Sequence, residues 1–210
     1  MSIKEEITSI VSLSEASFKE KGSLFIGKAF PIETEDEFET KLLAFKKEYY
    51  DATHHCFAYK LKDDQFRYSD AGEPNGTAGI RIYNAIEHFN LYDVGVIVVR
   101  YFGGTKLGVG PLGKAYYKSA EEVLASAVKV IKKPFKKIAI TTGFDYISTI
   151  HHYLPLFNAV IVNVDYSNVV SFIVEINSSS TKKLRELLIE ATNGNVELSE
   201  SEEIFYRTIW

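Results

Sequence analysis

The residues best suited to chemistry lie in one stretch, residues 94–118. Its first six residues, VGVIVV, are apolar and predict a strand buried on both faces. The strand is followed by glycines and basic residues with no acidic residue among them: Gly103, Gly104, Gly108, Gly110, Gly113, Arg100, Lys106, Lys114 and Lys118. Glycines let backbone N–H groups approach an anion, and a helix that begins beside them adds its positive end. The stretch therefore predicts an anion site in which Arg100, Lys106 and Lys114 converge.

Two familiar nucleotide motifs fit this stretch only in part. Residues 108–113 match G-x-G-x-x-G, but no strand directly precedes them and the region about 20 residues further on is basic rather than acidic. Residues 108–114 match G-x-x-x-x-G-K, but Ala115 stands where a P-loop needs a hydroxyl for Mg²⁺. A simpler alternative is that the glycines only permit close packing of strand and helix. We therefore favour a general anion site over both a dinucleotide-binding motif and a P-loop.

A second candidate site is the loop DAGEPNGTAG, residues 70–79. Asp70 and Glu73 can act as a carboxylate pair in acid–base chemistry or in metal binding. His54 is expected on the first strand of the hairpin that leads into this loop. The alternative, which the sequence favours, is a turn in which Thr77 caps the next helix. Neither histidine pair has a spacing that chelates a metal, so we expect no metal and no cofactor.

Composition narrows the class of protein. The 210 residues carry a net charge of −4, yet residues 94–144 contain nine Lys or Arg and only two acidic residues. Such a local field can attract a polyanion even when the whole chain is acidic. The single cysteine, Cys56, and the acidic N-terminal segment favour a cytoplasmic protein, and no apolar run is long enough to cross a membrane.

The spacing of apolar residues predicts the helices and strands that position these candidate residues. We expect short strands in the first 30 residues and a helix that a Thr34–Glu37 capping box begins. Further strands are expected at residues 54–61, 65–69 and 94–99, with a helix from about residue 112 to 128. The basic run 129–137 is expected to be a solvated linker. Residues 137–210 read as βαββαβ, with a helix at 145–157, which is the ferredoxin-like order.

Three segments carry a resemblance to a known family: DATHHC at 51–56, GEPNGTAG at 72–79, and VVRYFGG at 98–104, followed by Lys106, Leu107 and Gly108. Together they resemble the IMPACT family, and the second half is similar to the small C-terminal domain of its bacterial members. The resemblance implies an α+β protein of two domains. Residues 1–130 would form an IMPACT-type domain with the fold of ribosomal protein S5 domain 2, and residues 135–210 a ferredoxin-like domain.

The resemblance also implies a link to translation. The expected family surface maps here onto His54, Asp70, Glu73, Arg100, Tyr101, Phe102, Gly103, Gly104, Lys106 and Lys114. One departure is GPLGKAY at 110–116, where the family more often has GGLVRAY. Pro111 removes a backbone donor, and Lys114 replaces a bidentate Arg with a point charge.

Three functions are compatible with these features. The first is an RNA- or ribosome-associated regulator of translation that binds phosphates through Arg100, Lys106, Gly108 and Lys114, and stacks Tyr101 or Phe102 on an unpaired base. Because Tyr101 and Phe102 are adjacent on a strand, one of them is expected to face the core. The second is an enzyme that acts on a phosphorylated small molecule, with His54, Asp70 or Glu73 moving a proton. The third is an adaptor that binds proteins of the translation machinery through the second-domain sheet.

Overall fold

The computed structural model describes residues 3–209, which form two compact units. The first unit ends at Ile131, and the second comprises Lys132–Ile209. The helices and strands of the first unit are β1 (Ile7–Ile10), β2 (Ser14–Glu20), β3 (Ser23–Pro31), α1 (Glu35–Glu48), β4 (His54–Lys60), β5 (Phe66–Ser69), α2 (Gly79–His88), β6 (Val94–Tyr101) and α3 (Val109–Ser126).

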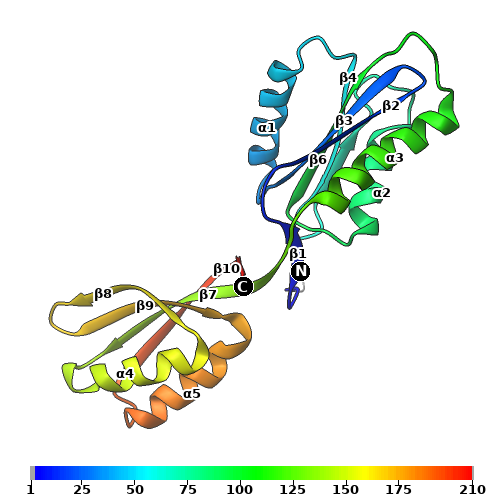
Figure 1. Ribbon diagram of the computed structural model, residues 1–210. Coiled ribbons are helices and arrows are strands. Elements are labelled where there is room, and N and C mark those ends of the chain that lie inside the picture. The colour runs from blue at the N-terminus through cyan, green and yellow to red at the C-terminus, as the bar shows by residue number, and fades with distance from the viewer. Residues whose placement is uncertain (1–2, 210) are drawn as a thin grey trace. The chain divides into compact units, whose positions relative to one another are not determined.

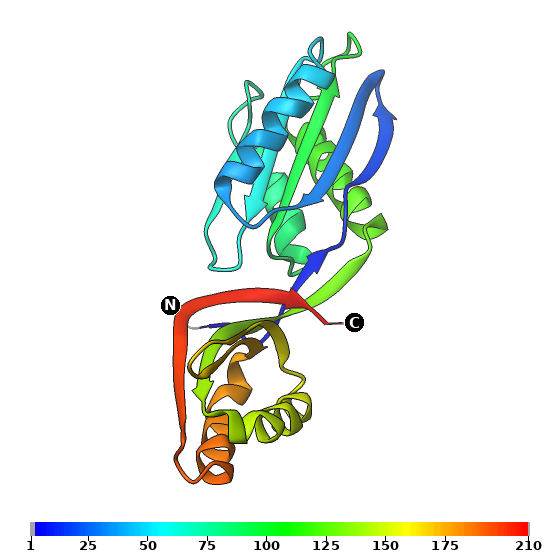
Figure 2. The same ribbon diagram turned by 90° about the vertical axis from the view of Figure 1, so that its left-hand side faces the viewer.

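The first unit is a sheet covered by helices on both faces. Its strands are antiparallel in the order β2-β3-β6-β4-β5. Helix α1 packs on one face, while α2 and α3 pack on the other (Figures 1 and 2). Two hydrophobic cores therefore lie on opposite sides of one sheet.

Strand β6 is central to both cores. Val96 and Val98 belong to the core under α2 and α3, whereas Ile97 and Val99 belong to the core under α1. This alternation explains the unbroken apolar sequence, since a strand covered on both faces needs apolar residues at every position. The buried strand expected at 94–99 is confirmed.

The Thr34 cap expected at the start of α1 is confirmed, while the Glu37 carboxylate bonds one residue before the N-cap rather than to Thr34 itself. The Thr34 hydroxyl accepts a hydrogen bond from the Glu37 N–H at 3.2 Å, and the Glu37 carboxylate accepts one from the Glu33 N–H at 2.7 Å. Phe38, Leu42 and Phe45 are the buried face of this helix. The cap thus fixes where the helix begins and which face meets the sheet.

The second unit has the ferredoxin-like arrangement. In its sheet, β9 lies between β7 and β8, and β10 pairs with β7, all of these pairs being antiparallel. The short strand β1 is also part of this sheet. The strands are β7 (Lys129–Thr142), β8 (Val160–Tyr166), β9 (Val170–Asn177) and β10 (Val196–Thr208), and the longer helices are α4 (Ile147–Tyr153) and α5 (Thr181–Ala191). Alternate residues of β9 enter a core with Leu184 and Leu188 of α5. The expected α+β class, with a small second domain after the first, is confirmed.

Several sequence expectations about elements are corrected. The basic run 129–137 is not a linker, because it lies within β7 and its residues 132–136 pair with β10. The helix expected at 145–157 consists of η1 (Phe144–Tyr146), α4 and η2 (Leu154–Phe157). Helix α3 begins at Val109, three residues before the expected start. None of the helices described is both long and apolar enough to cross a membrane.

Candidate functional site

Three strands of the first unit place one row of side chains beneath α2 and α3. Arg100 on β6 is directly opposite Phe25 on β3 and His54 on β4. Residues paired in this way point to the same face of a sheet. The row begins in the core at Phe25 and ends in a half-buried position at His54.

Asp70 organises the loop 70–79 that covers the end of this row. One of its carboxylate oxygens accepts hydrogen bonds from the N–H groups of Ala78 and Gly79 at 2.8 and 2.9 Å, and the other from the N–H of Gly76 at 2.9 Å. The carboxylate therefore caps α2 and closes the loop. The expected cap by Thr77 is wrong, because the Thr77 hydroxyl donates to the Pro74 carbonyl instead.

Glu73 is the centre of a buried polar cluster. Its Oε1 accepts from Arg100 Nη1 at 2.5 Å and from the Tyr116 hydroxyl at 2.8 Å, and His54 Nε2 lies 3.8 Å away. The Glu73 and Arg100 side chains are only 4% and 6% exposed. Arg100 also donates to the Ser23 hydroxyl at 3.3 Å. The charge of Arg100 is thus matched by a neighbouring carboxylate inside the protein.

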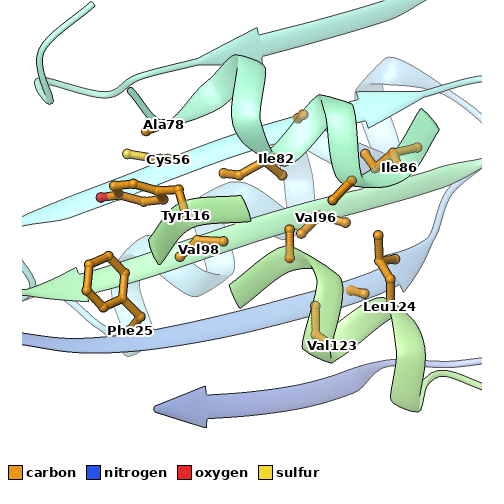
Figure 3. Packing of buried hydrophobic residues seen from close by; sticks show 14 of the residues in the cluster. Phe25, Cys56, Ala78, Ile82, Ile86, Val96, Val98, Tyr116, Val123 and Leu124 are labelled. Carbon is orange, nitrogen blue, oxygen red and sulfur yellow. The ribbon is translucent and has the colours of Figure 1, made fainter. Parts of the chain in front are cut away.

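Tyr116 and Cys56 complete this cluster and remain protonated. Tyr116 packs edge-on against Phe25, with 5.3 Å between ring centres, and lies beside Cys56 (Figure 3). Burial raises the pKa of the Cys56 thiol to about 12, and it also raises the pKa of the Tyr116 phenol. The Cys56 thiol donates to the Asp70 carbonyl at 3.0 Å. A protonated, hydrogen-bonded thiol is a poor nucleophile.

A pocket of about 350 Å³, which we name the α3 pocket, opens above this cluster. His54, Glu73 and Arg100 form its floor, and exposed Lys106 lies at its mouth. The other lining residues are mostly apolar: Pro74, Phe102, Leu107, Gly108, Val109 and Leu112. The α3 pocket thus combines apolar walls with a few polar groups, as small-ligand sites do.

A second hollow, which we name the Arg81 hollow, lies between α2 and the start of α3. It has a volume of about 470 Å³. Its lining residues are Arg81, Asn84, Val109, Gly110, Gly113, Lys114 and Tyr117. Val109 lines both cavities, so the α3 pocket and the Arg81 hollow adjoin at the first turn of the helix.

The three basic residues expected to converge have different surroundings. Arg100 and Lys106 line the α3 pocket, whereas Lys114 lines the Arg81 hollow. Among the described residues, Lys106, Lys114 and Arg81 form no ion pair with a carboxylate, although Arg81 Nε donates to the Gly76 carbonyl. Arg100 differs from these three because it is buried and paired.

The remaining predicted residues are placed as follows. Phe102 is 46% exposed and lines the α3 pocket, whereas Tyr101 packs against the core under α1. Gly103 packs against the Gly22 backbone so closely that a side chain would not fit. Gly104 and Gly108 have φ of 84° and 87°, which favours glycine. Backbone geometry therefore accounts for these three glycines.

Sequence reasoning missed two residues of the site, Arg81 and Tyr116. A signal existed for Tyr116, because a tyrosine within the apolar face of α3 needs a polar partner for its hydroxyl. For Arg81 we find none, since a basic residue on a surface helix is ordinary. No group of three or more potential metal ligands occurs among residues 3–209.

Comparison with known protein families and sequences gives consistent matches. Residues 21–124 match the Impact N-terminal domain, and residues 140–195 match a domain of unknown function, DUF1949. The chain is 31% identical to the IMPACT family member YvyE of Bacillus subtilis over 182 residues, covering 86% of this chain and 84% of YvyE. It is 30% identical to YigZ of Escherichia coli, covering 75% of this chain and 79% of YigZ.

A solved structure described as a hypothetical protein has the same fold. It superposes with a TM-score of 0.71 at 25% identity, covering 95% of this chain and all of that one. The similarity therefore extends over both units, and the range matched by the Impact N-terminal domain, residues 21–124, spans the site.

Proposed function

This chain belongs to the IMPACT family, and from that membership and the site geometry we propose that it is a cytoplasmic regulator of translation that binds RNA or the ribosome. The phosphate backbone would cross the start of α3, where the α3 pocket and the Arg81 hollow adjoin. One observation carries the proposal: the exposed cations Lys106, Lys114 and Arg81 lie in two adjoining cavities without carboxylate partners among the described residues.

The extended form of this surface favours a polymer over a small anion. Two cavities that share Val109 offer successive places for phosphates, and exposed Phe102 lies beside the first of them. Cations that already have protein partners gain little from a phosphate, whereas unpaired surface cations displace the counterions that are condensed on the nucleic acid. Aromatic side chains next to such cations stack on unpaired bases.

Titration with ribosomes and with structured RNA at about 50 mM salt tests the proposal. We expect binding by the wild-type protein, and a loss of several-fold in affinity for Lys106→Ala, Lys114→Ala and Arg81→Ala, because each removes one phosphate contact. Lys182→Ala, an exposed lysine on α5, is the matched control and leaves affinity unchanged. Absence of binding at this salt concentration would refute the proposal.

A second candidate, an enzyme acting on a phosphorylated small molecule, is favoured by the His54–Glu73 pair at the floor of the α3 pocket. Such an enzyme would hold the phosphate near Lys106 while His54 or Glu73 moves a proton. Incubation with a panel of phosphorylated metabolites, followed by mass spectrometry, tests it. Turnover that Glu73→Gln abolishes would support this candidate, and turnover unchanged in Glu73→Gln would remove Glu73 from it.

A further inference from the structure

The floor of the α3 pocket presents two hydrogen-bond acceptors side by side. His54 Nδ1 lies 2.9 Å from the Ala71 carbonyl oxygen, which can only accept, so Nδ1 carries the proton and Nε2 of neutral His54 is an acceptor. Glu73 Oε1 already accepts from Arg100 and Tyr116, whereas Oε2 has no partner among the described residues. With His54 Nε2 only 3.8 Å from Glu73 Oε1, one donor group can reach both side chains.

The walls and the charges restrict what can occupy the pocket. An anion gains little at the floor, because the Arg100 charge is matched by Glu73. At the mouth, in contrast, Lys106 is exposed and unpaired with any described carboxylate. Between floor and mouth the walls are apolar and include the Phe102 ring and Leu112. A ligand that fits carries N–H donors at one end, a flat apolar body, and a negative charge at the other end.

We propose that the α3 pocket binds an unpaired nucleobase bearing an exocyclic amino group, an inference that rests on the proposed binding of RNA. The amino group donates one hydrogen to Glu73 Oε2 and the other to His54 Nε2. The ring lies against Phe102, and the phosphate of the same nucleotide lies at Lys106. Cytosine, adenine and guanine have such a group. Uracil places a carbonyl oxygen where cytosine has its amino group, and that oxygen would face two acceptors.

Oligocytidylate and oligouridylate of equal length form a matched pair for the test, since their bases have nearly the same size. We expect the wild-type protein to bind oligocytidylate about tenfold more tightly, the usual effect of one good base contact. Glu73→Gln should bring the ratio close to one, because its amide can donate to the uracil oxygen. Lys106→Ala should weaken both oligonucleotides equally. Glu190→Gln, the same charge change on exposed α5, should leave the ratio unchanged.

The outcomes separate this inference from the proposed function. Equal binding of the two oligonucleotides, or a tenfold preference that survives in folded Glu73→Gln, would overturn the base pocket and leave RNA binding intact. Binding of neither oligonucleotide, nor of ribosomes, would overturn both. Should Glu73→Gln fail to fold, His54→Ala decides, since the pocket predicts a several-fold smaller preference and an unchanged preference contradicts it.

Binding of cytidine and uridine monophosphates shows whether the base comes from a free nucleotide or from RNA. The same preference for free cytidine monophosphate would indicate a free nucleotide, and a preference confined to oligonucleotides would indicate RNA.

Discussion

At the floor of the α3 pocket Arg100 is 6% exposed and bonded to Glu73, whereas at its mouth Lys106 is exposed and has no carboxylate partner among the described residues. The two cations are six residues apart in the sequence and belong to one basic stretch. A buried guanidinium needs a partner that neutralises it, and once paired it stabilises the fold. An exposed ammonium remains available to a phosphate. Clustered positive charge in a sequence therefore does not distinguish structural cations from binding cations.

The largest expected effect comes from breaking the pair at the floor. Glu73→Ala leaves Arg100 buried without its partner, which should lower the free energy of unfolding by about 3–5 kcal/mol. Urea denaturation measures this loss. Glu190→Ala on exposed α5 is the control and should change the free energy by less than about 0.5 kcal/mol. A loss for Glu73→Ala no greater than that of the control would show that Arg100 does not depend on Glu73.

The reactivity of the Cys56 thiol reports how well the buried cluster beneath the α3 pocket is shielded from solvent. Its pKa is raised to about 12, mainly by burial, so at pH 8 only about one thiol in ten thousand is ionised. Alkylation of the folded protein should therefore be about a thousandfold slower than that of the urea-unfolded chain. The neutral thiol also stabilises the fold below the unfolded-state pKa near 9, and this contribution is lost as the pH rises toward 12. Fast alkylation of the folded protein would show that this cluster is not shielded from solvent.

A smaller effect is expected from the loop that covers the floor. Asp70→Ala removes three backbone hydrogen bonds and the cap of α2, at a cost of about 2 kcal/mol in the free energy of unfolding. Asp70→Asn keeps an acceptor oxygen and should lose less, which the same urea titration measures. Equal losses for Asp70→Ala and Asp70→Asn would mean that the acceptor is not what stabilises the loop.

The comparison between the floor and the mouth of the α3 pocket also explains what the sequence could and could not predict. The buried part of strand β6 was predictable because residues 94–99 are apolar throughout. The cap of α1 was predictable because Thr34 and Glu37 stand at the required spacing. The pairing of Arg100 with Glu73 was not, because it joins a strand to a loop 27 residues away and leaves no local pattern.

The Arg81 hollow was missed for a similar reason. Its lining residues come from both α2 and α3, and only the packing of these helices brings Arg81 near Lys114. The prediction for the basic run in β7 was wrong in the opposite sense, because it assigned no regular structure to residues that form a strand. Lysine-rich sequence was expected to be a linker, but Lys136 pairs with Glu200 of the neighbouring strand β10, so the run is part of a sheet.

The salt dependence of binding to single-stranded RNA tests the central claim most directly, because its slope counts the phosphates that protein cations neutralise. Three contacts from Lys106, Lys114 and Arg81 predict that the logarithm of the affinity falls with the logarithm of salt concentration with a slope of about −2. The double variant Lys106→Ala, Lys114→Ala should keep wild-type stability and show a slope of about −0.7. A slope unchanged in that folded variant would contradict the claim that these exposed cations, rather than Arg100, hold the phosphates.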